Sequence, residues 1–147
     1  MGEQTVARKV LVVEDNPDNR KILVYRLRRM AVFATIEEAC DGREALACIE
    51  TDPPDLIIMD INMPEIDGLE VTRTVRATPG PVSAIPILLL TAQSTDSFAS
   101  QGYQAGCTDY LPKPIVDPKV LQAKVFACLG VAVLAGDRGR SVGSAAP

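Results

Sequence analysis

Residues 10–18 read Val-Leu-Val-Val-Glu-Asp-Asn-Pro-Asp and set a pattern that recurs along the chain. Four consecutive apolar residues, mostly β-branched, are typical of a strand buried on both faces of a parallel sheet. Asn16 before Pro17 indicates a helix start, because asparagine caps free amides and proline suits the first helical position. The helix continues through apolar residues at helical spacing, which are Ile22, Leu23, Leu27 and Met30. The stretch therefore predicts a buried strand that passes directly into a helix ending near Met30.

The same succession of apolar run and amphipathic segment occurs four more times. Further strands are predicted within residues 32–39, 56–60, 87–91 and 109–111. Further helices are predicted over residues 43–51, 69–77, a segment ending near 105, and 118–129, with a loop over 78–84. Five strands, each followed by a helix, predict an α/β fold: an open, doubly wound parallel sheet with helices on both faces and right-handed crossovers.

Length and composition narrow the class of protein. The 147 residues suit one domain, and 47% hydrophobic with 23% charged residues is near the globular average. A net charge of -4 without a strongly basic run argues against nucleic acid as a direct partner. The short basic segment of Arg26, Arg28 and Arg29 is expected to be a solvated helix face. No apolar run approaches the ~20 residues of a membrane span, and residues 1–9 lack the apolar core of a signal peptide. We therefore expect no membrane association and a cytoplasmic location.

Cysteine and histidine contents exclude several chemistries. The four cysteines show no CxxC and no zinc spacing, so in a reducing compartment we expect them to be small packing residues. The chain contains no histidine, which removes Ser-His and Cys-His arrangements and any phosphohistidine of its own. If phosphoryl transfer occurs here, the donor must belong to another molecule.

Polar side chains follow the predicted strands where ligands of such sheets bind, beyond the carboxyl ends. They are Glu14, Asp15, Asp60, Thr91 and Lys113. Three carboxylates so close together repel one another unless a cation lies between them. Mg²⁺ prefers oxygen ligands and often uses one or two carboxylates together with phosphate oxygens. The cluster therefore predicts a site for Mg²⁺, or for Mn²⁺, rather than a set of solvated loop charges.

Asp60 is the predicted reactive group of this cluster. A carboxylate can act as a nucleophile toward phosphorus, and a bound metal spreads the developing charge. Lys113 is expected to pair with one phosphoryl oxygen, and the Thr91 hydroxyl to donate to another. Ala92 is small and leaves the site open to a donor.

These segments together resemble the receiver domains of two-component response regulators. The matching stretches are residues 10–15, 59–68, 91–92 and 109–114, with Asp41-Gly42 and Ala105-Gly106 where the family usually has them. Each is weak alone, but the set in this order is highly specific. The resemblance covers residues 9–129, and we divide the chain into an extension (1–8), a single receiver domain (9–130) and a disordered tail (131–147). It implies a flavodoxin-like sheet with strand order 2-1-3-4-5.

The resemblance also implies roles for individual residues. Asp60 is the expected phosphoacceptor, and the expected metal ligands are Glu14, Asp15, Asp60 and the backbone carbonyl of Asn62. Thr91 and Tyr110 resemble the switch pair and Lys113 the phosphate-contacting lysine, with a cis peptide before Pro114. The implied donor is a histidine kinase or a histidine phosphotransfer protein. The implied output partner is a protein that binds the face of the fourth helix, fifth strand and last helix, on a monomer or a weak phosphorylation-dependent dimer.

Three other interpretations of these residues are possible. A flavodoxin-like cofactor binder needs a Gly-, Ser- or Thr-rich phosphate loop, where this chain has acidic residues 14–18. An aspartyl phosphohydrolase commonly has an acid two residues after its nucleophile, where this chain has Asn62. A receiver-like module that takes no phosphate would not need the complete set of site residues. A stand-alone regulator, a phosphorelay intermediate and the receiver of a hybrid kinase all stay open.

Overall fold

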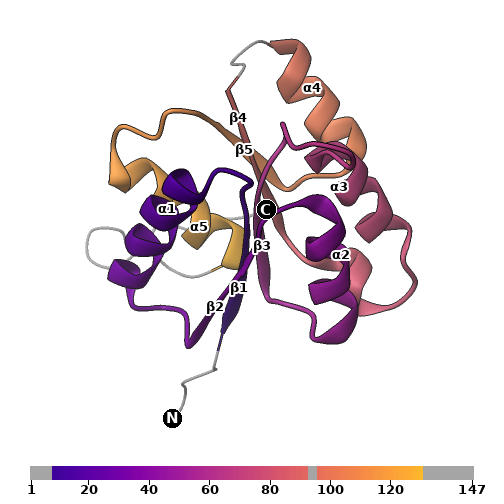
Figure 1. The fold of residues 1–147 in the computed structure, drawn as a ribbon, viewed down its shortest axis with the longest axis horizontal. Helices are drawn as coiled ribbons and strands as arrows, with labels where there is room; N and C mark the ends of the chain where they lie inside the picture. The colour runs from indigo at the N-terminus through magenta and orange to yellow at the C-terminus, as the bar shows by residue number, and fades with distance from the viewer. Residues whose placement is uncertain (1–7, 93–95, 131–147) are drawn as a thin grey trace.

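The computed structural model describes residues 8–92 and 96–130 and arranges five strands and their helices in alternation (Figure 1). The strands are β1 (Lys9–Val13), β2 (Thr35–Ala39), β3 (Leu56–Asp60), β4 (Ile87–Thr91) and β5 (Asp109–Pro112). The helices are α1 (Pro17–Met30), α2 (Gly42–Thr51), α3 (Gly68–Ala77), the short 3₁₀ helix η1 (Pro81–Ala84), α4 (Asp96–Ala105) and α5 (Pro118–Leu129).

The five strands form one parallel sheet in the order β2-β1-β3-β4-β5. This confirms the predicted fold class and strand order. All residues of β3 and β4 are buried, because both strands lie inside the sheet and are covered on both faces. The outer strands β2 and β5 are partly exposed, which explains why their sequences are less apolar.

Two helical layers cover the sheet and divide the core into two clusters. Helices α1 and α5 lie on one face and α2, α3 and α4 on the other (Figure 1). Alternate strand residues point to opposite layers, so neighbours such as Leu11 and Val12 belong to different clusters. Both clusters are dominated by Val, Ile and Leu, which is consistent with an aromatic content of only 4%.

Most helix boundaries follow from local capping. The side chain of Asn16 accepts hydrogen bonds from the amides of Asp18 and Asn19, so α1 begins as the Asn-Pro pair predicts. Asp41, Asp67 and Asp117 cap α2, α3 and α5 in the same manner.

The second strand, Thr35–Ala39, lies within the predicted residues 32–39. Two details differ from the sequence expectations. The predicted loop over residues 78–84 contains η1, whose first residue Pro81 suits a helical turn. Arg26, expected on a solvated helix face, instead donates to the carbonyl of Ile115 over 2.6 Å.

Arg76, near the end of α3, joins two connecting segments, one containing η1 and the other following α4. Its guanidinium donates to the carbonyls of Gly106 (2.7 Å), Ser83 (2.9 Å) and Ile85 (2.7 Å). Gly106 has φ 110°, and a Cβ there would lie 2.7 Å from Arg76 Cγ. The C-terminal end of α4 is thereby fixed to α3.

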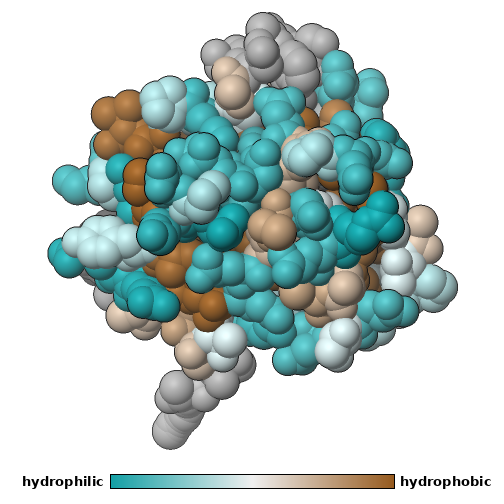
Figure 2. Space-filling model, viewed as in Figure 1, coloured by the Kyte–Doolittle hydropathy of each residue, from teal (hydrophilic) through white to brown (hydrophobic). Residues whose placement is uncertain are grey.

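Within the described ranges, no helix is long and apolar enough to cross a membrane. Residues 1–7 of the extension expected over 1–8, and the whole tail expected over 131–147, lie outside the described residues. Figure 2 shows a mostly hydrophilic face, with apolar colour gathered over the connection from β5 to α5. Val116 in this connection is 81% exposed, and Ile22 of α1 is 54% exposed.

Candidate phosphoacceptor and metal site

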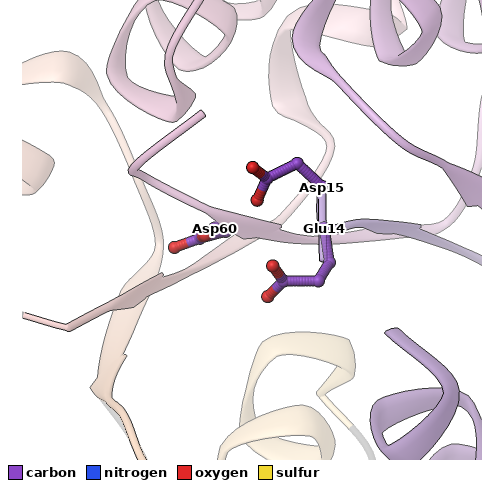
Figure 3. Close-up of side chains that lie close together, drawn as sticks. All are labelled: Glu14, Asp15 and Asp60. Carbon is purple, nitrogen blue, oxygen red and sulfur yellow. The ribbon is translucent and has the colours of Figure 1, made fainter. Parts of the chain in front are cut away.

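The acidic side chains predicted at the strand ends come together in the structure. Carboxylate oxygens of Glu14, Asp15 and Asp60 all lie within 4.8 Å of one another. Figure 3 shows Glu14 and Asp15 leaving the same turn after β1, with Asp60 reaching the same space from β3. The side chains of Glu14 and Asp60 are 2% and 4% exposed, whereas Asp15 is exposed. The site is thus a partly enclosed acidic cluster that opens to solvent on one side.

One described lysine reaches the cluster from β5. Lys113 Nζ lies 3.1 Å from Glu14 Oε1 and 3.4 Å from Asp60 Oδ2. Its own amide donates to the Thr91 carbonyl over 2.7 Å, which fixes the end of β5 beside the end of β4. The peptide between Lys113 and Pro114 is cis, as the resemblance implied.

The electrostatics of Asp60 indicate that this cluster has less positive than negative charge. Burial raises the pKa of Asp60 to about 6; Lys113 and the Asn62 amide oppose the shift, and Glu14 adds to it. Burial alone would lower the pKa of Lys113, but Asp60 and Glu14 raise it above its usual value. A single ammonium therefore leaves the three carboxylates undercompensated, so a further cation beside Asp60 would be stabilised.

The residues present fit a hard divalent cation. The cluster offers only oxygen atoms, one of its acids is exposed, and the spacing of the carboxylates allows them to share one ion. Asn62 is exposed, and its amide donates to Asp60 Oδ1 over 3.3 Å. The assignment of its carbonyl as a ligand stays a prediction.

Thr91 and Tyr110, the predicted switch residues, occupy neighbouring strands. Thr91 is the last residue of β4 and is 1% exposed. Tyr110 lies in β5, half-buried against the core under α2, α3 and α4. Its ring contacts the edge of Tyr103 in α4, with centroids 6.0 Å apart and planes at 85°.

Two residues that support the site were not predicted from the sequence as such. Arg20 donates to the Glu14 carbonyl over 2.7 Å, and the Asn16 amide donates to Glu14 Oε2 over 3.2 Å. Arg20 follows the helix cap Asn16 by one helical turn. An arginine at this spacing is the only feature of the sequence that could have indicated the contact with Glu14. Both contacts fix the backbone that carries Glu14 and Asp15.

The start of α3 also fits closely beneath the site. A Cβ on Gly68 would lie 2.5 Å from the Asp60 carbonyl oxygen and 2.8 Å from Ile61 Cα. Only glycine therefore allows this approach, which explains the Asp67-Gly68 pair in the loop after β3.

A pocket of about 410 Å³ opens beside the cluster, between α1 and the connection from β5 to α5. Its lining combines Glu14 and Lys113 with apolar side chains, including Ile22, Leu23, Leu90 and Ile115. An apolar recess thus borders the reactive edge of the sheet.

A parallel sheet of this order, with acidic residues and a lysine gathered at its carboxyl edge, defines the class of flavodoxin-like signalling domains. The response regulator receiver domain family matches residues 10–126. The chain belongs to this family, and it is therefore a receiver domain of the two-component type.

Individual relatives agree with this assignment. Response regulator MprA of Mycolicibacterium vanbaalenii is 43% identical over 115 residues, which are 77% of this chain and 47% of that protein. The chain thus spans about half the length of the curated relatives that it matches.

Solved structures agree as well. Chemotaxis protein CheY4 of Vibrio cholerae has a TM-score of 0.76 at 34% identity, covering 84% of this chain and 100% of that one. The receiver domain of sensor histidine kinase PA1611 from Pseudomonas aeruginosa has a TM-score of 0.75 at 32% identity, covering 85% and 99%. The PA1611 structure contains a magnesium ion coordinated in its active site cleft.

Proposed function

We propose that this domain accepts one phosphoryl group on Asp60 from a phosphohistidine of another protein and thereby changes its surface for a protein partner. The observation that carries the proposal is the pairing of buried Asp60 with Lys113 inside an undercompensated acidic cluster. A phosphorylation-switched binding role fits these residues better than turnover of a metabolite. We place this activity in the cytoplasm, where two-component kinases present their phosphohistidines.

The proposed transfer uses the residues at the strand ends. An Asp60 carboxylate oxygen forms the new P–O bond while the donor's N–P bond breaks, and the electron pair stays on the donor imidazole. The Lys113 ammonium, held near Asp60, pairs with a phosphoryl oxygen as negative charge develops. The Thr91 hydroxyl donates to another of these oxygens.

Glu14, Asp15, Asp60 and the Asn62 carbonyl would hold Mg²⁺, or Mn²⁺ in its place. The bound ion would supply positive charge to the carboxylates and to the incoming phosphoryl group. The magnesium in the PA1611 receiver domain supports this choice of metal.

The protein that carries the phosphohistidine would bind at the recess between α1 and the connection from β5 to α5. The recess borders Lys113 directly, and the exposed side chains of Ile22 and Val116 flank it with apolar surface. A helical histidine kinase or phosphotransfer protein would cover this surface while its histidine reaches Asp60.

Phosphorylation would act on the Thr91/Tyr110 pair. The new phosphoryl group adds nearly two negative charges and draws the Thr91 hydroxyl toward it. The Tyr110 ring would then change its packing, and the face formed by α4, β5 and α5 would shift its population of states. A downstream protein would bind this face, and a weak phosphorylation-dependent dimer is an alternative readout.

Intact mass spectrometry tests the proposal. The domain is incubated with acetyl phosphate and Mg²⁺, and we expect a gain of one phosphoryl group. Asp60→Asn should gain none, whereas Asp55→Asn, at the opposite end of β3, should label like the wild type. Equal labelling of the wild type and Asp60→Asn would contradict the assignment. Steady release of phosphate from unrelated phosphomonoesters would favour the phosphohydrolase instead.

A further inference from the structure

The carboxylate of Asp109 joins three elements at the edge of the sheet. Oδ1 accepts hydrogen bonds from the Tyr103 hydroxyl of α4 at 3.0 Å and from the Tyr110 amide of β5 at 2.8 Å. Lys124 Nζ of α5 lies 3.2 Å from Oδ1 and 3.0 Å from Oδ2. Since α4 and α5 cover opposite faces of the sheet (Figure 1), one side chain connects both helical layers to the edge strand.

The charges at this carboxylate favour a lasting contact. Burial alone would raise the pKa of Asp109, but the hydrogen bonds from Lys124, Tyr110 and Tyr103 lower it below its usual value. Burial, together with the bond to Asp109, raises the pKa of Tyr103 to about 12. Asp109 is therefore ionised and Tyr103 protonated throughout the neutral range, which keeps acceptor and donor matched.

Tyr103 connects this carboxylate to the proposed switch residue. Its hydroxyl is held by Asp109 while its ring meets the Tyr110 ring edge to face. A movement of the Tyr110 ring must either leave Tyr103 behind or carry it along. If Tyr103 stays in place, the contact between the two rings is lost. If Tyr103 moves with Tyr110, its hydrogen bond to Asp109 is strained or broken.

We propose that Asp109, with Tyr103 and Lys124, forms a latch that positions Tyr110 and α4 in the unphosphorylated arrangement. The latch opposes the movement of Tyr110 and α4 that phosphorylation of Asp60 favours. Its strength therefore sets how far the equilibrium between the two arrangements shifts when Asp60 is modified. This inference rests on the proposed function. These three residues act through Tyr110, and the latch lies at the start of β5, whereas Lys113 follows its end.

Three variants weaken the latch in different ways, and two serve as controls. Tyr103→Phe removes the hydroxyl but keeps the ring, Asp109→Asn removes the charge, and Lys124→Gln removes the cation. Lys124→Arg keeps the ion pair and should restore wild-type behaviour. The matched control is Tyr25→Phe, because Tyr25 is 61% exposed on α1 and its ring contacts Arg29 instead.

Amide hydrogen exchange of the phosphoryl-free domain is the first measurement. We expect amides of α4 and β5 to exchange about five- to tenfold faster in the three latch variants, because a hydrogen bond to a charged group is lost. Amides of β1 and α1 should be unchanged, and Tyr25→Phe should match the wild type. Unchanged exchange in α4 and β5, or an equal increase in β1, would overturn the latch.

Fluorine NMR of the 3-fluorotyrosine-labelled domain is the second measurement. The chain has three tyrosines, so the Tyr110 signal is assigned from single Tyr→Phe variants. With Mg²⁺, the beryllofluoride concentration that moves this signal halfway should fall about five- to tenfold in Tyr103→Phe and Asp109→Asn. Lys124→Arg should respond like the wild type, because arginine keeps the ion pair with Asp109. If the lysine acted only through its packing, this substitution would not preserve the wild-type response.

The two proposals fail in distinguishable ways. If wild-type Asp60 accepts no phosphoryl group, the proposed function fails, while the exchange data still show whether Asp109 holds α4. If Asp60 is labelled normally but the latch variants leave both α4 exchange and the Tyr110 midpoint unchanged, only the latch fails.

Discussion

Two lysines pair with carboxylates at opposite ends of the sheet, and their surroundings differ. Lys9, at the start of β1, lies 2.9 Å from Glu37 and 3.0 Å from Asp52, and it also donates to the Asp52 carbonyl over 2.7 Å. Lys113 lies 3.1 and 3.4 Å from its two carboxylates. At Lys9 the cation is the more buried partner, because the acids are 36% and 76% exposed against its 15%. At Lys113 the acids are the buried partners, at 2% and 4%.

This difference separates a structural ion cluster from a reactive one. Glu37 and Asp52 are much more exposed than Glu14 and Asp60, so the cluster around Lys9 closes the amino end of the sheet at little electrostatic cost, although its two acids also outnumber their lysine. Buried acids that outnumber their lysine store an electrostatic cost, which appears as the raised pKa of Asp60. A bound metal cation can relieve that cost, whereas a phosphoryl group without the cation would add further negative charge.

Replacing each lysine in turn should give the largest difference in stability between the two ends of the sheet. Lys113→Met leaves Glu14 and Asp60 buried without their cation and should lower the free energy of unfolding by about 3 kcal/mol. Lys9→Met should cost less, about 1–2 kcal/mol, because Asp52 stays hydrated. Added Mg²⁺ should restore much of the loss in Lys113→Met only. Urea unfolding with and without Mg²⁺ measures both, and recovery of both variants would contradict the comparison.

Neutralising an acid should weaken Mg²⁺ binding at the carboxyl end of the sheet but not at the amino end. Glu14→Gln or Asp15→Asn should weaken Mg²⁺ binding at least about tenfold, because each removes a predicted ligand. Glu37→Gln, in the Lys9 cluster, should leave Mg²⁺ affinity unchanged. Calorimetric titration of each purified variant gives these affinities. A similar loss in Glu37→Gln would indicate that Mg²⁺ acts through net charge rather than at a site.

The stability of the metal-free domain should depend on pH through Asp60, a buried acid that has no counterpart in the Lys9 cluster. The folded pKa of Asp60, about 6, lies above its usual value of 3.8, so the folded state binds more protons between these pH values. Stability from this group is therefore present at low pH and is lost as pH rises toward 6. Asp60→Asn should stabilise the metal-free domain at pH 7 by about 1–2 kcal/mol. Thermal unfolding at pH 4.5 and pH 7 should show the gain mainly at pH 7.

The smallest effect is expected at the exposed acid of the Lys9 cluster. Asp52→Asn should cost about 0–1 kcal/mol, and raised salt should remove most of this cost. Unfolding in low and high NaCl measures it. A cost that salt leaves unchanged would mean that the bond from Lys9 to the Asp52 carbonyl, rather than the charge, carries the interaction.

The fold could be predicted largely because its signals are local. Apolar runs and capping residues determine where elements begin, and α1 and α5 begin and end at the predicted residues, Pro17–Met30 and Pro118–Leu129. The convergence of Glu14, Asp15, Asp60 and Lys113 was also predictable, since carboxyl ends of parallel strands share one edge. The second strand could be predicted only within a wider range, residues 32–39, because an edge strand carries a weaker apolar pattern.

The remaining contacts depend on side chains that meet only after folding. Nothing local pairs Lys9 with Glu37, Arg76 with Gly106, or Asp109 with Lys124, because each pair joins separate elements. The sequence indicates only that Asp109 belongs to a motif and that Arg26 lies on a solvated helix face. Their partners follow from the register of β5 and from the packing of α1 beside α5.

The three hydrogen bonds of Arg76 have a mechanical consequence. They tie the carbonyl of Gly106, directly after α4, to α3 and to the segment before β4. At Gly68, α3 in turn packs so closely against the strand that carries Asp60 that a Cβ would not fit. Because the C-terminal end of α4 is tied to α3, we expect any displacement of α4 to be smallest at Gly106 and greatest at its first turn. The helix would then act as a lever with its pivot near Gly106, held by the Arg76 guanidinium.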